Sequence, residues 1–345
     1  MKNKVFHLSH IDLDGYGCQY LTSLAFKDIN FYNANYGPEV GARLKEIISG
    51  IKSGNLAKNA TILITDLNLS PKEAAWIEKE AKELEANLVL LDHHITGLNS
   101  SEKHDWYHLD ITKSATLLTY DWLKKNYDFD MEGKFKTVVD AINDVDMWHS
   151  KNDYFEYGKV MMSMISSAKE INRIMFQKYD IDYKHFLIDS AKKLLSGNDA
   201  HIKLDDNIHA LKKEFFINDK NDTKDNLIAS YVSSLLSQNK DRFTISYKGF
   251  KGLLGYNVGN SSIIGNTFLV NNPEFDFYMD INFRGIFSLR GHDKLDLSSM
   301  AALIGNGGGH KNASGGKIEE FHDSFVYEDI KDFVQRYIND KSFGS

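Results

Sequence analysis

The N-terminal half of the chain alternates short apolar runs with longer stretches whose apolar residues recur at helical spacing. Runs of this length predict buried strands, which we expect at residues 5–8, 31–36, 61–64 and 88–91. The intervening stretches predict helices at residues 15–27, 40–48, from residue 71 on, 113–125 and 134–143. Such alternation is typical of βαβ units, so we expect an α/β fold whose mostly parallel sheet is flanked by helices.

One helix start is marked by several residues at once. Ser70 suits the N-cap, Pro71 the first helical position, and Glu73 the third position of a capping box. An apolar stripe then recurs at Ala74, Ile77, Ala81 and Leu84. We therefore expect a helix to begin directly after Ser70.

The pattern changes in the second half of the chain. Residues 191–240 read as polar helices and charge-rich segments, and strand-like runs follow at 243–247, 252–258, 275–281 and 285–289. Helices are expected at 261–270, 297–305 and 326–338. With 345 residues the chain is long enough for two cores. We predict a catalytic domain at residues 1–190, a helical connector at 191–240 and a smaller α/β domain with a mixed sheet at 241–345.

Composition and charge narrow the class of ligand. Lysine and arginine number 41 against 48 acidic residues, a net charge of −7, whereas proteins that track long nucleic acids are usually basic. We expect small ligands or very short oligonucleotides, and no long duplex. The single cysteine, Cys18, excludes an intrachain disulfide and a cysteine-clustered zinc site. With no apolar run near 20 residues and no signal core, we expect a cytoplasmic protein without a membrane partner.

Acidic and imidazole side chains follow three of the predicted strands. The first strand is followed by His10, Asp12 and Asp14, the third by Asp66, and the fourth by Asp92, His93 and His94. Because the carboxyl ends of parallel strands share one edge, these groups should converge. Several carboxylates a few ångströms apart repel one another unless a cation neutralises them. Aspartate with histidine suits borderline ions such as Mn²⁺. Two such metal ions side by side stabilise the attacking and leaving oxygens of a phosphoryl displacement.

Two other motifs use similar spacing. An EF-hand requires glutamate at the twelfth position of its loop, and a loop that starts at Asp12 has Ser23 there. The string DLDG after a strand is also typical of haloacid-dehalogenase phosphatases, in which Asp12 would be a covalent nucleophile. That alternative explains neither His10 nor the DHH triplet, but it stays open on the residues alone.

The strings HIDLDG at 10–15, TDLNLS at 65–70, LDHH at 91–94 and TKSATLLTYDWL at 112–123 together resemble the DHH phosphoesterase superfamily. That superfamily includes RecJ-like nucleases, oligoribonucleases, phosphoadenosine-phosphate phosphatases and cyclic-dinucleotide phosphodiesterases. The string NGGGHKNASGG at 306–316 resembles the glycine-rich signature of the DHH-associated C-terminal domain. The resemblance covers essentially the whole chain.

The resemblance implies two divalent ions, most often Mn²⁺, with shared ligands. One ion would be held by His10, Asp12 and Asp66. The other would be held by Asp14, Asp66, His93 and an acid of the string AINDVDMW, for which Asp144 is the first choice and Asp146 the alternative. Asp92 would orient a histidine, and His94 would lie near the scissile phosphate.

The glycine-rich string also has a physical interpretation. Gly307, Gly308 and Gly309 can adopt positive φ and turn their N–H groups into one concavity for phosphate, to which His310 adds a donor. Arg284 and Arg290 lie on adjacent predicted strands and are expected to bind a second phosphate.

The leading hypothesis is hydrolysis of short RNA oligonucleotides, dinucleotides included, to mononucleotide 5′-phosphates by two-metal hydroxide attack. The alternatives in this class are a 3′-phosphoadenosine-5′-phosphate phosphatase and a phosphodiesterase of cyclic-di-AMP or linear dinucleotides. A haloacid-dehalogenase-like phosphatase and a catalytically inactive nucleotide sensor are the alternatives of other classes. A homodimer is left open.

Overall fold

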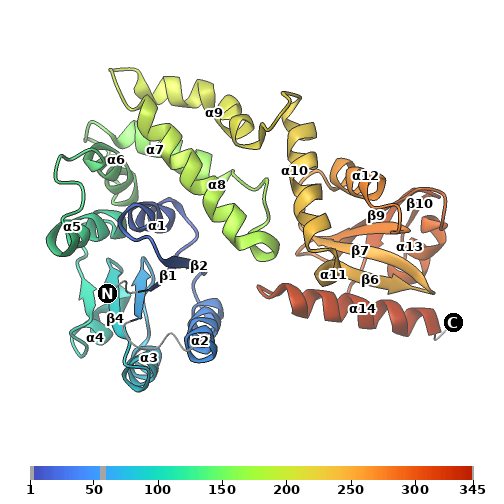
Figure 1. Cartoon of the computed structure of the whole chain (residues 1–345), viewed down its shortest axis with the longest axis horizontal. Helices are drawn as coiled ribbons and strands as arrows, with labels where there is room; N and C mark the ends of the chain where they lie inside the picture. The colour runs from blue at the N-terminus through green and yellow to red at the C-terminus, as the bar shows by residue number, and fades with distance from the viewer. Residues whose placement is uncertain (1–3, 55–59, 344–345) are drawn as a thin grey trace. The chain divides into compact units, whose positions relative to one another are not determined.

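The computed structural model describes residues 4–54 and 60–343, and their contacts divide them into two compact units (Figure 1). Unit 1 contains the described residues up to Ala168 together with Ile181–Leu211. Unit 2 contains Lys169–Asp180 and the described residues from Lys212 on. The three-part domain division expected from the sequence stays a prediction.

Unit 1 contains a five-stranded sheet in which every pair of neighbouring strands is parallel. The strands are β1 (Val5–Ser9), β2 (Ile29–Asn33), β3 (Thr61–Thr65), β4 (Asn87–Asp92) and β5 (Tyr107–Leu109), in the order β2-β1-β3-β4-β5. The predicted parallel α/β sheet is confirmed. The sequence did not indicate β5, which has three residues of which Tyr107 alone is buried. It also placed the second strand too late, since β2 ends at Asn33.

Helices cover both faces of this sheet. They are α1 (Leu13–Ala25), α2 (Pro38–Ser53), α3 (Pro71–Glu83), the 3₁₀ turn η1 (Ile95–Gly97), α4 (Leu98–Ser101), α5 (Ala115–Tyr127), α6 (Lys136–Asp146) and α7 (Phe155–Ser166). The helices α8 (Arg173–Leu194) and α9 (Ala200–Phe216) contribute residues to both units. The capping box is confirmed: Ser70 Oγ accepts from the N–H of Glu73, and the Glu73 carboxylate accepts from the N–H of Ser70.

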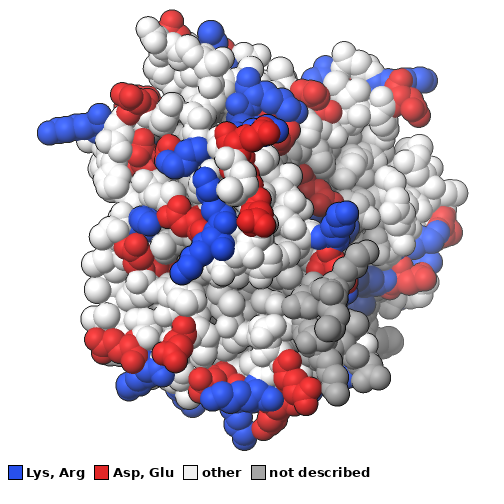
Figure 2. Space-filling model, turned by 60° about the vertical axis from the view of Figure 1, so that its left-hand side comes forward, with Lys and Arg blue, Asp and Glu red and all other residues white. Residues whose placement is uncertain are grey.

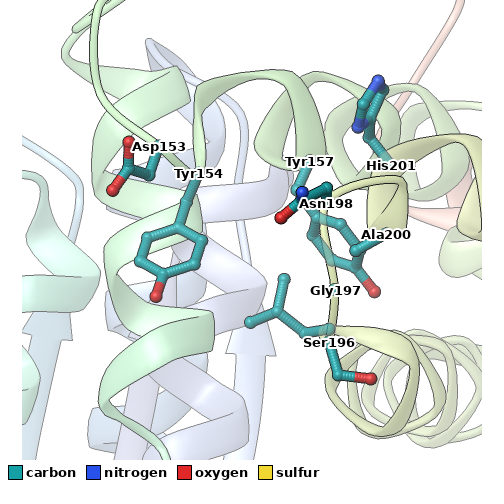
Figure 3. A pocket seen from close by; sticks show the side chains of 9 residues that line it. Asp153, Tyr154, Tyr157, Ser196, Gly197, Asn198, Ala200 and His201 are labelled. Atoms are coloured by element: carbon teal, nitrogen blue, oxygen red, sulfur yellow. The ribbon is translucent and has the colours of Figure 1, made fainter.

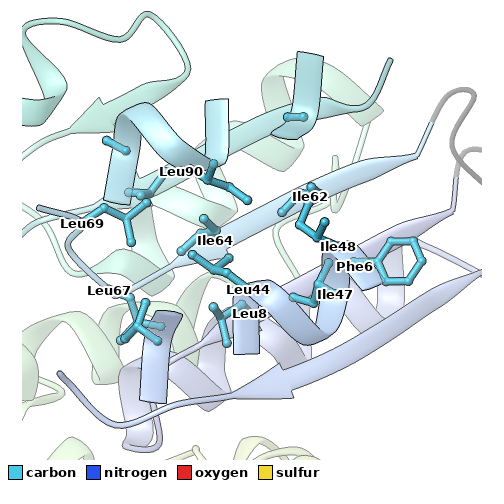
Figure 4. Packing of buried hydrophobic residues seen from close by; sticks show 14 of the residues in the cluster. Phe6, Leu8, Leu44, Ile47, Ile48, Ile62, Ile64, Leu67, Leu69 and Leu90 are labelled. Carbon is cyan, nitrogen blue, oxygen red and sulfur yellow. The ribbon is translucent and has the colours of Figure 1, made fainter. Parts of the chain in front are cut away.

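The main core of unit 1 lies between the sheet and the helices α2 and α3 (Figure 4). Phe6 and Leu8 alternate along β1 on this face and meet Leu44 and Ile47 of α2. Val5, on the opposite face, belongs to a separate cluster with Leu63 and Leu91. Each fully buried aliphatic side chain contributes about 1.5–3 kcal/mol relative to exposure. Packing on both faces therefore fixes the carboxyl ends of the central strands.

Unit 2 is built on a six-stranded sheet. Its strands are β6 (Thr244–Tyr247), β7 (Phe250–Tyr256), β8 (Phe277–Ile281), β9 (Ile286–Gly291), β10 (Gly308–His310) and β11 (Ala313–Lys317), in the order β10-β11-β9-β8-β7-β6. Its helices are α10 (Lys224–Gln238), α11 (Lys240–Phe243), α12 (Ser261–Asn271), α13 (Leu297–Gly305) and α14 (Tyr327–Phe343). The β7–β8 pair is parallel and the other pairs are antiparallel, so the predicted mixed sheet is confirmed. No helix in the described part of either unit has both the length and the apolar character needed to cross a membrane.

Candidate metal centre

The predicted acids and histidines meet where the strand order of unit 1 reverses. The chain passes from β1 to β2 on one side and then returns to β3 on the other side of β1. Open α/β sheets bind ligands in the crevice at such a reversal, outside the carboxyl ends of the strands. His10 follows β1, Asp66 follows β3 and His93 follows β4, so all three lie at this edge.

Local backbone conformation holds Asp12 and Asp66 in place. Asp12 is the N-cap of α1 and accepts from the N–H of Gly15 at 3.0 Å. A Cβ atom on Gly15 would lie 2.4 Å from the carbonyl oxygen of His10, so the turn requires glycine there. Asp66 has a φ of +56°, an uncommon conformation for a residue other than glycine. This strained residue at the end of β3 is the kind of feature that functional sites retain.

The string TKSATLLTYDWL acts on the site through the start of α5. Asp14 is buried in the first turn of α1, and its carboxylate accepts from the N–H groups of Ala115 at 2.7 Å and Thr116 at 2.8 Å. Ser114 caps the same helix end by accepting from the N–H of Leu117. Free N–H groups at a helix N-terminus favour an anionic partner, so α5 fixes the orientation of the Asp14 carboxylate.

Three groups of side chains in the described chain have ligand atoms within 4.8 Å of one another. They are His10–Asp12–Asp66, Asp66–His93–His94 and Asp14–His93–Asp146. The Nε2 atom of His93 lies 3.3 Å from Asp66 Oδ1, 3.6 Å from Asp146 Oδ2 and 3.9 Å from Asp14 Oδ2. The groups therefore share Asp66 and His93 and form one continuous cluster.

The structure brings Asp146, and not Asp144, into this cluster. Both acids lie on α6, but positions two residues apart on a helix point in different directions. The Asp144 carboxylate accepts from Asn152 Nδ2 at 2.8 Å and lies 4.0 Å from His149 Nδ1. Asp144 therefore ties α6 to the loop that follows it, and Asp146 is the acid of the string AINDVDMW that joins the other candidate ligands.

Burial and mutual repulsion change the acid–base properties of the cluster. Burial, and then the charges of Asp12 and Asp14, raise the pKa of Asp66 well above its ordinary value. Burial and the charge of Asp14 raise the pKa of Asp146 to about 9. Burial lowers the pKa of His10, but the carboxylates of Asp12 and Asp66, with oxygens 2.9 Å and 3.6 Å from His10 Nδ1, outweigh it and raise that pKa to about 10. Without another cation, the cluster retains protons at neutral pH.

The donor set fits divalent cations. The Nδ1 atom of His10 and the Oδ2 atom of Asp66 are buried, and neither makes a hydrogen bond of good geometry to a described residue, although Asp12 Oδ2 lies 2.9 Å from His10 Nδ1. Unpaired buried polar atoms are costly, and a metal ion would satisfy both. Carboxylate oxygens mixed with imidazole nitrogens suit borderline ions such as Mn²⁺.

His94 is held between two partners. Its Nδ1 lies 2.7 Å from Asp92 Oδ1, and its Nε2 lies 2.9 Å from the hydroxyl oxygen of Tyr36. Asp92 is fully buried and also accepts from the hydroxyl of Tyr107 at 2.7 Å. Because a carboxylate only accepts, this arrangement places the His94 proton on Nδ1 and leaves Nε2 as the acceptor.

The sequence did not single out either of these two tyrosines. Tyr36 follows β2 and so lies at the same sheet edge as the other groups, but the predicted second strand ran through it. Its ring also packs against His10, with the ring centroids 4.3 Å apart. The strand-end rule would have found Tyr36 had the end of β2 been placed at Asn33. Nothing in the sequence marks Tyr107 as a partner of Asp92.

The glycine-rich string of unit 2 does not have the conformation expected from the sequence. Gly308–His310 form the edge strand β10, and Gly309 alone of the three glycines has a positive φ, of +143°. The predicted concavity of successive left-handed glycines is therefore wrong. A Cβ atom on Gly307 would lie 2.0 Å from the carbonyl oxygen of Gly315, so close packing requires glycine there. A Cβ atom on Gly308 would meet nothing within 4 Å.

The two predicted arginines do not lie on adjacent strands. Arg284 is in the turn between β8 and β9, whereas Arg290 is near the far end of β9, about 20 Å along the chain. The expectation that both bind one phosphate is therefore wrong. Arg290 pairs with Ala313, and Ala313 pairs with His310, so these side chains point to one face of the sheet. The Arg290 guanidinium also contacts Ser262 at the start of α12.

Unit 1 also contains a cavity of about 570 Å³ outside the cluster (Figure 3). It is lined by residues of the α7 N-terminus, among them Tyr154 and Tyr157, and by residues 195–198, 200 and 201. None of the nine lining residues is a predicted site residue.

Metal binding should stabilise unit 1 more at high pH than at low pH. The folded, metal-free protein holds protons on His10 up to about pH 10 and on Asp146 up to about pH 9. In the unfolded chain the two groups have their ordinary pKa values of 6.5 and 3.8, so they release these protons at lower pH. The folded state then binds more protons, so its stability falls as pH rises, with both groups contributing between about pH 6.5 and 9.

We expect Mn²⁺ at 100 times its Kd to add about 2.7 kcal/mol, or about 5–10 °C in Tm. Thermal unfolding with EDTA or Mn²⁺ at pH 6.5 and 8.5 measures this, and the gain should be larger at pH 8.5. An equal Tm with and without Mn²⁺ at both pH values would exclude a metal site in this cluster.

Comparison with known proteins gives the family. No family model matches the chain. It is 41% identical over 346 residues to a 3',5'-cyclic-nucleotide phosphodiesterase of Helicobacter pylori, covering 97% of this chain and 99% of that protein. It is 26% identical over 338 residues to oligoribonuclease NrnB of Bacillus subtilis, covering 94% of this chain and 76% of that protein.

A crystal structure of an uncharacterized protein from Helicobacter pylori G27 has the same fold, with a TM-score of 0.91 and 40% identity over 98% of this chain and 99% of that one. The haloacid-dehalogenase alternative loses its support, because the two sequence relatives are named as a phosphodiesterase and an oligoribonuclease. These similarities, together with acids and histidines that the fold gathers at one sheet edge, place the chain in the DHH phosphoesterase superfamily as a metal-dependent phosphodiesterase.

Proposed function

We propose that this chain hydrolyses the phosphodiester bond of small nucleotides. The two candidate substrate classes are 3′,5′-cyclic mononucleotides and linear dinucleotides. The observation that carries the proposal is the continuous cluster in which Asp66 and His93 are shared between groups of ligand atoms. When bound there, two divalent ions would neutralise charge on the phosphoryl oxygens and supply Lewis acidity. We propose Mn²⁺ because imidazole and carboxylate donors are mixed.

The residues of the cluster divide into ligands and a group that faces the ester. We assign His10, Asp12 and Asp66 to one ion, and Asp14, Asp66, His93 and Asp146 to the other. His94 is assigned to the scissile phosphate. Asp92 holds the proton on His94 Nδ1, so His94 Nε2 is the atom that faces the substrate, and it donates to an ester oxygen when the imidazole carries both protons.

The two relatives support different substrate classes. The 41% identical protein is named for 3',5'-cyclic nucleotides, and the 26% identical protein for oligoribonucleotides. Both substrates present a phosphodiester beside a nucleoside, so one metal cluster can serve either. The net charge of −7 opposes tracking of long strands. Figure 2 shows acidic and basic side chains interspersed over the face that it draws, in keeping with a small substrate.

We further propose that one face of the unit 2 sheet binds a phosphate of linear substrates. Arg290 and His310 lie in one row across β9, β11 and β10, and the neighbouring row consists of Ser288, Gly315 and Gly308. The glycines leave the backbone accessible beside two cationic or hydrogen-bonding side chains. The start of α12 lies at the same place, with Ser261 Oγ 3.1 Å from Ser288 Oγ. A helix N-terminus with an arginine favours anions.

A substrate panel with Mn²⁺ tests the proposal. Initial rates should be compared for 3′,5′-cyclic AMP, the linear dinucleotide pApA, 3′-phosphoadenosine-5′-phosphate and RNA strands of five and 20 nucleotides. We expect cleavage of the first two and little gain beyond about five nucleotides, because a compact site encloses only a small ligand. Equal cleavage of 20-nucleotide strands would make the protein a RecJ-like exonuclease of long substrates.

Two changes in unit 2 should affect linear substrates selectively. His310→Ala removes a donor, and Gly308→Val adds a side chain in open space at a position without positive φ. We expect each to lower kcat/KM on pApA about 10- to 100-fold relative to bis-p-nitrophenyl phosphate, because the binding energy of remote groups is used in the transition state. Lys311→Ala, which removes an exposed ion pair with Asp293, is the control. Equal slowing of both substrates would make this face a structural element.

A further inference from the structure

Trp148 combines two features that are unusual for a tryptophan. Its side chain is 64% exposed, and its φ is +54°. A bulky residue in the left-handed region is a conformational outlier, and glycine or asparagine would occupy it at lower cost. An exposed indole contributes little to the core. Strain and exposure kept together in one residue indicate that its ring serves something other than packing.

The turn after α6 determines this conformation. The N–H of Trp148 donates to the carbonyl of Val145 at 3.2 Å, and the N–H of His149 donates to the carbonyl of Asp144 at 2.7 Å. The N–H of Ser150 in turn donates to the carbonyl of Trp148 at 2.9 Å. With the Asn152–Asp144 hydrogen bond, these contacts hold the backbone of Trp148 on both sides. The residue is fixed in the folded protein before any ligand arrives.

The ring itself is held from one side. Its centroid lies 5.2 Å from that of Phe155, and the two rings are nearly perpendicular, at 84°. An edge contact of this kind is favourable for aromatic rings and restricts the orientation of the indole. Most of the indole surface nevertheless stays exposed, which leaves a flat and oriented aromatic surface open to a ligand.

Trp148 is close to the metal cluster along the chain. Trp148 is two residues after Asp146, whose carboxylate is 3.6 Å from His93 Nε2, and two residues span at most about 7 Å. The nucleoside of a phosphodiester bound at the cluster would lie within that range. Nucleic-acid-binding proteins use exposed aromatic rings as stacking surfaces for bases.

We propose that the indole of Trp148 stacks on the nucleobase next to the scissile phosphate, which makes it a specificity-determining residue. The proposal rests on the function proposed above. It implies that the enzyme selects phosphodiesters that carry a base over phosphodiesters that do not. Purines should be preferred to pyrimidines, because their larger ring system covers more of the indole.

The kinetic test compares 3′,5′-cyclic AMP with ribose 3′,5′-cyclic phosphate, which has no base, and pApA with its abasic analogue. Trp148→Ala should lower the ratio of kcat/KM on the base-bearing to the base-free ester about 10- to 100-fold. Trp148→Phe should keep most of the ratio. Trp148→Gly should lower it as the alanine variant does, while a higher Tm than alanine shows that the positive φ is relieved. Tyr127→Ala, which removes a 47% exposed ring outside the cluster, should leave the ratio unchanged.

A binding measurement separates failure of this inference from failure of the proposed function. Titration of the Mn²⁺-loaded protein with adenosine 5′-monophosphate should quench tryptophan emission, and Trp148→Phe should remove that quenching while the other three tryptophans still emit. Quenching without hydrolysis of any diester would overturn the function and keep the stacking surface. Hydrolysis with an unchanged ratio in Trp148→Ala, and with equal quenching in Trp148→Phe, would overturn the inference alone.

Discussion

Replacement of Asp66 by asparagine is expected to lower phosphodiester hydrolysis by on the order of 10³-fold or more, with the fold retained. Residues that only orient metal ligands cost 10- to 100-fold when they are changed, and Asp66 belongs to two of the three groups of candidate ligands. Asparagine suits this position because it adopts positive φ more readily than most residues, and Asp66 has a φ of +56°. The variant removes a shared negative charge without removing the shape of the side chain.

The stability of the metal-free variant gives a second measurement. Burial and the charges of Asp12 and Asp14 disfavour the ionised form of Asp66, so the neutral amide should leave the metal-free protein at least as stable as the wild type. The Tm gain from Mn²⁺ should shrink in the same variant. Asp110→Asn is the control, because Asp110 follows β5 at the same sheet edge but accepts from Thr112 instead. Activity of Asp66→Asn near that of Asp110→Asn would remove Asp66 from the site.

The positions of most candidate ligands follow from the sequence because the fold places them by a general rule. His10, Asp66 and His93 each follow a short apolar run, and a parallel sheet brings the carboxyl ends of its strands to one edge. The rule requires only that the strands be parallel and near one another in the sheet. It needs no knowledge of loops. The same rule fails for Tyr36 because the end of β2 was placed three residues late.

The direction in which each side chain of α6 points is harder to predict from the hydrophobic pattern of the sequence. The expected helix over residues 134–143 stops three residues before the end of α6 at Asp146. With the helix ended at 143, both acids of the string AINDVDMW lie in a loop, and the hydrophobic pattern gave no reason to revise the first choice, Asp144. The continued helix points the two acids in different directions: Asp146 lies 3.6 Å from His93 Nε2, whereas the buried Asp144 accepts from Asn152. One additional helical turn therefore decides the choice between two acids.

The glycine-rich string shows a different limit. Three successive glycines have little strand propensity, and the sequence favoured a loop of left-handed residues. In the structure, Gly308–His310 pair with β11 as an edge strand, and Gly307 is required because the chain passes close to Gly315. Both causes are tertiary: they depend on a neighbouring strand that local sequence patterns do not describe. The predicted role of His310 survives this correction as a proposal, but the predicted backbone shape does not.

Asp146→Asn should lower kcat/KM on bis-p-nitrophenyl phosphate about 100-fold or more, whereas Asp144→Asn should leave it near the wild-type value. Asp146 lies 3.6 Å from His93 Nε2 and in the group with Asp14, so its loss removes a candidate ligand. Asp144 accepts from Asn152, and an asparagine oxygen at 144 can still accept that hydrogen bond, at a cost of about 1 kcal/mol or less. Both variants replace an aspartate by asparagine on the same helix, two residues apart. A difference between their activities therefore depends on position and not on the type of substitution.

The pH dependence of stability distinguishes the two variants without any substrate. Burial and Asp14 raise the pKa of Asp146 to about 9, so the metal-free wild type loses stability as pH rises from about 4 towards 9. Asp146→Asn cannot ionise and should remove part of that loss, so that at pH 8.5 and in EDTA its Tm exceeds that of the wild type. Asp144→Asn should keep the wild-type slope. A loss of activity in Asp144→Asn, with Asp146→Asn active, would return the role of metal ligand to Asp144 and require a different side-chain arrangement at the end of α6.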